Sequence, residues 1–240
     1  MSSAPAYATL GDLSPNRRLG LFTWIALLCL LAWDFSGLDQ GVMHALAPDG
    51  IFTLRNNWWL ETILHTRAKQ LAILVYLGLL VMVWWPKGAL TQWTRFQRVE
   101  VMVGITLSLI TISTLKSFSL SSCPWELQDF GGVAAYVSHW QWGMPDGGSG
   151  RCFPGGHVSS AFAFLALALP WLGSTQPAQR SLGGRILIGV VAAALVLGMT
   201  QTLRGAHYPS HTFWTGLICW TVALGNHFLF GWLAQRRSRN

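Results

Sequence analysis

Charged residues are scarce in this chain: they make up 10% of its 240 residues, against about 25% in a typical soluble domain. Hydrophobic residues account for 52%. This composition excludes an ordinary soluble domain and indicates an integral membrane protein. The 14 tryptophans agree with this interpretation, because indole rings favour the headgroup level of a bilayer.

Acidic residues are fewer than basic ones, 9 against 16, which gives a formal net charge of +7. The basic residues are scattered among short loops and the termini and form no basic helical face, so we exclude nucleic acid as a partner. The chain also lacks internal repeats, low-complexity tracts and any linker long enough to separate two domains. We therefore predict a single membrane-embedded domain over residues 1–240.

Six uncharged apolar runs predict an all-α integral membrane protein, a bundle of six transmembrane helices. The runs lie at about 19–33, 70–86, 101–115, 158–173, 186–203 and 212–234. Several are shorter than the roughly 20 residues of a straight span, and flanking Trp, Lys or Arg would extend them to the interface. The first run could be a signal peptide, but no small-x-small cleavage site follows it, so we interpret it as an uncleaved helix. Around Trp58-Trp59 we expect an interfacial helix lying in the membrane plane.

The distribution of basic residues predicts the orientation. With the N-terminus inside, the inner segments hold ten of the 16 Lys and Arg residues and the outer segments hold six. The positive-inside rule then places both termini in the cytoplasm. We expect a multi-pass protein of a bacterial inner membrane, with the loop at 117–156 on the outer, periplasmic side.

Cysteine is rare, with four residues. Cys29 and Cys219 fall within predicted spans and are interpreted as small apolar residues. Cys123 and Cys152 share the outer loop, which lies in an oxidising compartment under this topology. We expect a disulfide between them, and two free thiols are the alternative.

Sets of Cys, His or Asp with metal-site spacing are lacking, so we expect no metal and no other cofactor. His207 and His211 are four residues apart, but Pro209 between them argues against a regular helix that would pair them as ligands. Polar residues collect instead at three span ends that share the outer side, where Lys116, His157 and His207 stand. The predicted topology therefore brings them to one face of the membrane.

Together these residues are typical of an anion pocket. Gly155 and Gly156 stand at a helix N-terminus, where backbone N–H groups can approach a ligand closely. His157 and His207 are available for proton transfer or nucleophilic attack. Positive charge suited to phosphate oxygens comes from three residues of neighbouring loops: Lys116, Arg151 and Arg204.

At these residues the chain resembles the type 2 phosphatidic-acid phosphatase family of integral membrane lipid phosphatases, which is related to vanadium haloperoxidases. That family shows Lys-x6-Arg-Pro, then Pro-Ser-Gly-His, then Ser-Arg-x5-His-x3-Asp. The first motif reads "KSFSLSSCP" here, with Lys116 and Pro124 kept and Cys123 in place of the arginine. The second reads "PGGH", with His157 kept and Gly155 in place of the serine.

The third motif reads "TQTLRGAHYPSH", with His207 kept, Gln201 at the arginine position and His211 at the aspartate position. The resemblance covers about 116–216 and implies that His207 attacks phosphorus to form a phosphohistidine while His157 protonates the leaving oxygen. It also implies a set of phosphate-binding groups, with nearby arginines replacing the two that are missing: Lys116, Arg151, Gly155, Gly156, Gln201 and Arg204.

The missing aspartate would normally orient the nucleophilic imidazole and stabilise its positive form. His211 could take this place, and the acidic loop residues Glu126 and Asp129 are alternatives. Because the lysine and both histidines are present, we interpret the chain as a divergent member and not as an inactive enzyme.

The leading hypothesis is a lipid phosphate or diphosphate phosphatase that acts on the periplasmic face, with undecaprenyl diphosphate or a lipid A phosphate as the first candidate substrates. Its partners would be the lipid substrate and the bilayer. The sequence makes no prediction about the oligomeric state. A lipid-to-lipid phosphotransferase is an alternative. Two noncatalytic alternatives are a transport protein and a lipid-phosphate receptor. A transport protein would need polar residues deep within its spans. A receptor would bind a lipid phosphate without releasing inorganic phosphate from it.

Overall fold

The computed structural model describes residues 13–239 of the chain, with side chains from residue 17 onward. Residues 1–12 and 240, which the predicted single domain includes, lie outside this range. Within it the structure is helical and contains no strand, apart from an isolated bridge between Leu127 and Ala134. The fold is thus all-α, as the sequence predicts.

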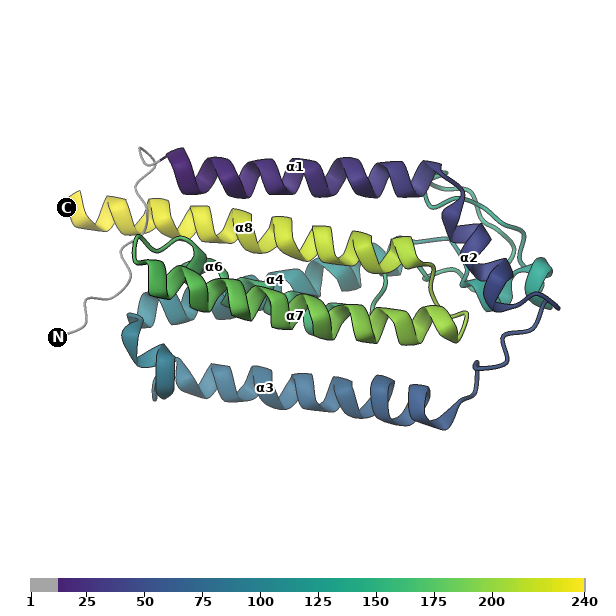
Figure 1. Cartoon of the computed structure of the whole chain (residues 1–240), viewed down its shortest axis with the longest axis horizontal. Coiled ribbons are helices and arrows are strands. Elements are labelled where there is room, and N and C mark those ends of the chain that lie inside the picture. The colour runs from purple at the N-terminus through teal and green to yellow at the C-terminus, as the bar shows by residue number, and fades with distance from the viewer. Residues whose placement is uncertain (1–12, 240) are drawn as a thin grey trace.

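Five helices are long and apolar enough to cross a membrane. One of them begins as a π-helical segment, η1 (Trp59–Arg67), and continues as α3 (Ala68–Met82). The other four are α1 (Leu13–Phe35), α4 (Arg95–Phe118), α7 (Pro177–Leu203) and α8 (Pro209–Arg239). All five run along the long axis of the molecule (Figure 1). The shorter elements between them are α2 (Leu38–Leu46), η2 (Gly88–Gln92), η3 (Pro124–Glu126) and η4 (Gln128–Phe130).

The fourth predicted span is shorter and less regular than expected. It consists of α5 (Ser159–Phe162), η5 (Ala163–Leu167) and α6 (Leu169–Leu172), an apolar tract of fewer than 18 residues. Pro170 in its last part has no N–H to donate, which interrupts the helical hydrogen bonding. The tract runs beside α8, since Gly155 before it lies against His211 and Gly173 after it lies against His227. It is enclosed by protein, so the described residues contain five long helices and one short internal tract.

The expectation of a separate helix in the membrane plane at Trp58-Trp59 is wrong. Trp59 begins the helix that continues to Met82, and the whole of it is a candidate span. The short helix in this region is α2, which lies across the end of the bundle (Figure 1). The second long helix therefore begins with the π-helical segment η1, which precedes the apolar run predicted from residue 70.

The two ends of the bundle carry different elements. α1 begins and α8 ends at one end, whereas α2 and the long connection between α4 and α5 lie at the other (Figure 1). This is the arrangement that an even number of crossings produces. Which end faces the cytoplasm remains a prediction from the charge distribution.

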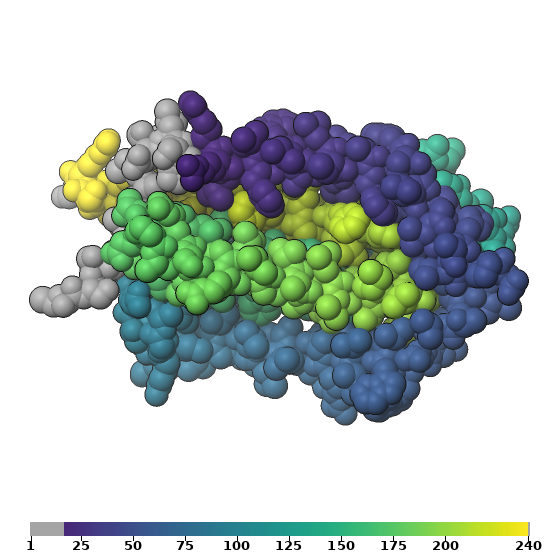
Figure 2. Space-filling model, in the orientation of Figure 1, coloured from purple at the N-terminus to yellow at the C-terminus, as the bar shows by residue number. Residues whose placement is uncertain are grey.

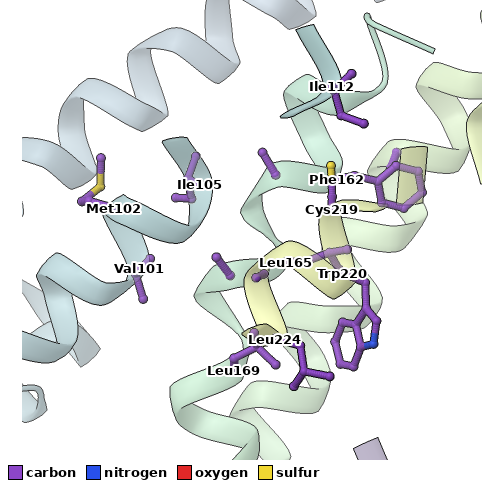
Figure 3. Close-up of a cluster of buried hydrophobic side chains, with 14 of the residues drawn as sticks. Val101, Met102, Ile105, Ile112, Phe162, Leu165, Leu169, Cys219, Trp220 and Leu224 are labelled. Carbon is purple, nitrogen blue, oxygen red and sulfur yellow. The ribbon is translucent and has the colours of Figure 1, made fainter. Parts of the chain in front are cut away.

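The core lies where α4, α8 and the internal tract meet (Figure 3). Its buried side chains include Ile105 of α4, Leu165 of the tract and Trp220 of α8. Near the end that holds the termini, a hydrogen bond of 2.6 Å joins Glu100 of α4 to His227 of α8. By contrast, α1 and α3 flank the bundle (Figure 2), and only 6% of each span window is buried. Two such exposed apolar helices are suited to contact with lipid.

Candidate active site

One cavity of about 510 Å³ opens at the end of the bundle that carries the long connection. It lies between α3, α4, the start of the internal tract and the end of α7. Five of the residues selected from the sequence line it: Lys116, Gly156, His157, Gln201 and His207. Groups from three distant parts of the chain therefore meet around one space.

His207 is the most deeply placed imidazole that faces this cavity. It lies between α7 and α8, and its backbone N–H donates to the carbonyl of Gln201. Its Nδ1 lies 3.3 Å from Sγ of Cys152 and 3.3 Å from Nδ1 of His211, which leaves Nε2 for the cavity. Burial, with Lys116 and His157 nearby, lowers the pKa of His207 to about 3. The ring is therefore neutral at pH 7, the form that a nucleophile requires.

His211 is the immediate neighbour of His207, in the first turn of α8. Its own side chain is buried, and its carbonyl accepts hydrogen bonds from the N–H of Gly155 and the hydroxyl of Thr215. The contact between the two Nδ1 atoms suits a pair in which one neutral ring donates and the other accepts. His211 thus occupies the place from which the orientation of His207 can be set.

The two acidic alternatives have other partners. Glu126 accepts a hydrogen bond from the backbone N–H of Cys123 and another from the hydroxyl of Ser149. Asp129 lies 3.8 Å from the ring of His44 on α2. These contacts leave His211, and neither carboxylate, as the neighbour of His207.

A buried carboxylate does lie behind His211, at the end of α1. The rings of His139 and His211 are 6.0 Å apart, and Nε2 of His139 lies 3.2 Å from Oδ2 of Asp34. The indole N–H groups of Trp140 and Trp214 donate to the same oxygen. Neither His139 nor Asp34 is among the residues selected from the sequence. A carboxylate at the end of an apolar run, in "AWDF", was the available signal.

The start of α8 is held by α2. The carboxylate of Asp39 accepts hydrogen bonds from the backbone N–H and the hydroxyl of Ser210. A negative group is favourable at this position because the N-terminus of a helix carries partial positive charge. Burial raises the pKa of Asp39 although these hydrogen bonds oppose the effect. The position of His211, one residue further, is therefore fixed by two elements.

His157 faces the cavity from the start of the internal tract. Its Nε2 donates to the carbonyl of Leu64, 3.0 Å away in the π-helical segment η1. Because a carbonyl only accepts, Nε2 carries the proton and Nδ1, which is buried without a partner among the described residues, holds the lone pair. Burial, with the positive Lys69 and the ring of His65 nearby, lowers the pKa of His157 to about 4. This histidine is also neutral at pH 7 before a ligand binds.

Lys116 and Gly156 depend on one another. Lys116 stands in the last turn of α4, and its Nζ donates to the carbonyl of Arg151. The stem of the lysine crosses Gly156 so closely that a Cβ there would lie 2.9 Å from Cδ of Lys116. Only glycine permits this path of the side chain into the cavity.

We predict that Gly156→Ala lowers kcat/KM for phosphate ester hydrolysis about 10-fold or more, since it displaces an ammonium that stabilises phosphate oxygens. The melting temperature should change little, because the displaced atoms belong to a flexible side chain. The matched control is Gly184→Ala on α7, where a Cβ meets nothing within 4 Å. Equal kinetics of the two variants would contradict the assigned path of the lysine.

Three further residues selected from the sequence lie near the cavity without lining it. The N–H of Gly155 is used by the carbonyl of His211 at 3.3 Å, and Arg151 offers Lys116 its carbonyl while its side chain is exposed. Arg204 is buried, donates through Nε to the carbonyl of Arg55, and lies 3.5 Å from Glu61. These three residues do not line the cavity, and their contact with phosphate stays a prediction.

Two basic residues that line the cavity, His65 and Lys69, were missed from the sequence. The ring of His65 packs against that of His157 with centroids 4.2 Å apart. Lys69 lies four residues further along the same helix, and both residues line the cavity. Their spacing by four, which places two side chains on one helix face, was the available signal.

A disulfide joins Cys123 to Cys152, the pair selected from the sequence, and ties the long connection together beside His207. Potential ligand atoms of these two cysteines and His207 lie within 4.8 Å of one another. The two sulfurs are bonded to each other, so they provide no thiolate for a metal ion.

The sequence profile of the PAP2 superfamily matches residues 98–237, more than half of the chain. Comparison with curated proteins and with solved structures gave no match. The matched range carries Lys116, His157 and His207, which the structure brings to one cavity. The chain therefore belongs to the PAP2 superfamily, the proteins that resemble type 2 phosphatidic-acid phosphatases.

Proposed function

We propose that this protein is a membrane enzyme that removes a phosphoryl group from a lipid phosphate or diphosphate through a phosphohistidine on His207. Members of the PAP2 superfamily are phosphatases. The observation that carries the proposal is the meeting of two neutral imidazoles, His207 and His157, with the ammonium of Lys116 around one cavity. A nucleophile, an acid and a fixed positive charge are the groups that phosphoryl transfer needs.

In the proposed reaction, Nε2 of His207 attacks phosphorus while His211 holds Nδ1. Lys116 and the backbone N–H of Gly156 stabilise the charge on the phosphoryl oxygens. The negative charge of a bound phosphate favours the protonated form of His157, whose Nδ1 has a free lone pair. His157 would take up a proton when the substrate binds and deliver it to the leaving oxygen.

The walls of the cavity support a lipid substrate. Apolar side chains of α3 and α4, such as Ile73 and Leu109, line the cavity together with the histidines. A second cavity of about 530 Å³ between α3 and α7 is almost wholly apolar and shares Ala72, Ser160 and Phe164 with the first. A polar head in the cavity at the histidines and a hydrocarbon chain in the neighbouring apolar cavity along α3 would fit this arrangement.

Among lipids of this kind we propose undecaprenyl diphosphate or a lipid A phosphate, hydrolysed at the periplasmic face of a bacterial inner membrane. The charge distribution of the loops supports this orientation, with both termini in the cytoplasm. Hydrolysis uses water as the acceptor. A phosphotransferase would use a lipid alcohol in its place.

The test is a turnover panel with the purified protein in detergent, in which several lipid phosphates are offered and vanadate is added as an inhibitor. We expect release of inorganic phosphate that vanadate blocks. An added lipid alcohol that gains phosphate would identify a transferase. A folded protein that binds vanadate and releases no phosphate from any substrate would contradict catalysis.

The pKa of His207 predicts an unusual pH dependence. Because this pKa is lowered to about 3, the ring stays neutral and nucleophilic as the pH falls from 7 to 5. We expect kcat/KM, corrected for ionisation of the substrate, not to fall over this range. An imidazole with the ordinary pKa of about 6.5 would lose roughly 30-fold between neutrality and pH 5. An acid limb centred near pH 6.5 would therefore contradict the burial of this group.

A further inference from the structure

The cavity contains more basic groups than the transfer of a single phosphoryl group requires. Lys116 and the two catalytic histidines account for the proposed reaction. His65 and Lys69, on the helix that begins at Trp59, line the same space in addition. No aspartate or glutamate is found among the described residues that line it. Such an excess of basic groups matches a ligand that carries more negative charge than one phosphate.

The position of these two residues relates them to the leaving group. In an in-line displacement the attacking and leaving atoms lie on opposite sides of phosphorus. His207 attacks, so the leaving group lies on the side of His157, which protonates it. The ring of His65 packs against His157 at a tilt of 32°, and Lys69 follows one turn later on the same helix face. The leaving group must therefore lie beside the imidazole of His65 and the ammonium of Lys69.

A positive environment distinguishes between two classes of leaving group. A lipid alcohol needs a proton and is then neutral, so it gains little from a nearby lysine. A lipid monophosphate carries negative charge throughout, and an ammonium beside it stabilises the transition state in which the bridging bond breaks. The charge of Lys69 acts at this position, since it is among the causes of the lowered pKa of His157.

We infer that the substrate is a lipid diphosphate, whose terminal phosphate is transferred to His207 while His65 and Lys69 bind the phosphate that stays on the lipid. This inference rests on the proposed function. A bond forms between Nε2 of His207 and the terminal phosphorus as the bridging P–O bond breaks. The lipid monophosphate leaves with the bonding electron pair and accepts the proton of His157. Water then attacks the phosphohistidine, returns a proton to His157 and releases inorganic phosphate.

The test compares a polyprenyl diphosphate with the monophosphate of the same chain length, in detergent, for the wild type and the variant Lys69→Gln. Lys69 is exposed at the mouth of the cavity, so the substitution leaves the fold intact. We expect kcat/KM for the diphosphate to fall about 10–100-fold and that for the monophosphate to change less than about 3-fold. Lys69→Arg should retain most of the activity toward the diphosphate. Lys87→Gln, at an exposed lysine of the opposite end, is the matched control.

The outcomes separate the inference from the proposed function. Phosphate release from neither substrate by the wild type would overturn both. Release from the two substrates at similar kcat/KM, or an equal effect of Lys69→Gln on both, would overturn the inference alone. With the diphosphate, the lipid product must be the monophosphate, formed in equal amount with inorganic phosphate. Formation of the lipid alcohol before any lipid monophosphate would also overturn the assignment of the two phosphates.

Discussion

Replacing His207 with glutamine is expected to abolish phosphate release, with a fall in kcat of about 10⁴-fold or more. The reason is geometric: Nδ1 of His207 is occupied by Cys152 and His211, and Nε2 faces the cavity. Glutamine keeps a polar contact with His211 but offers no nucleophilic nitrogen. The measurement is inorganic phosphate released by the purified variant, with its melting temperature as the check on folding.

Trapping of the intermediate makes this prediction sharper. A substrate labelled in the transferred phosphate should leave an acid-labile label on the wild type during turnover and none on the His207 variant. His44→Gln is the control, because His44 has a half-exposed side chain beside Asp129 and lies outside the cavity. Retained label or retained turnover in the His207 variant would exclude it as the nucleophile.

The second large effect is expected for His157→Gln, about 10²–10⁴-fold in kcat for a lipid phosphate. Glutamine can still donate to the carbonyl of Leu64, so the local structure should persist. What it cannot do is deliver a proton to the leaving oxygen.

The diagnostic is the dependence on the leaving group. An aryl phosphate with an acidic phenol needs little protonation, so His157→Gln should slow it far less than it slows a lipid phosphate. The His207 variant should lose its activity toward both substrates to the same extent. Equal losses for both substrates in His157→Gln would show that this residue binds phosphate without acting as the acid.

Much of the fold could be predicted from hydropathy, because a long uncharged run has few alternatives to a lipid-exposed helix. Two departures from this prediction have separate physical causes. The tract that ends at Leu172 is enclosed beside α8, so it need not have the length or regularity of a span. The first turns of the helix that begins at Trp59 face the cavity and therefore include polar residues such as Glu61 and His65. Because of this polarity, hydropathy did not predict these turns as part of a span.

The site was predictable where the sequence motifs supply the side chain itself, as with Lys116, His157 and His207. It was not predictable where a tertiary contact decides the role of a group. Gly155 gives its N–H to α8, and Arg204 finds its partners in the segment before η1 and within it. Nothing in the local sequence of either residue shows these partners.

The region that matches the superfamily begins at residue 98, yet the acid and the start of α8 are held from outside it, by Leu64 and Asp39. A fragment trimmed to the matched region would keep its reactive side chains and lose the supports that aim them. In addition, α3 shares few contacts with the rest of the bundle while it borders the head and tail spaces. Engineering of a new lipid preference should therefore start with residues 70–82 of α3, which follow Leu64, His65 and Lys69, so that changes there leave the support of His157 and the proposed leaving-group site in place.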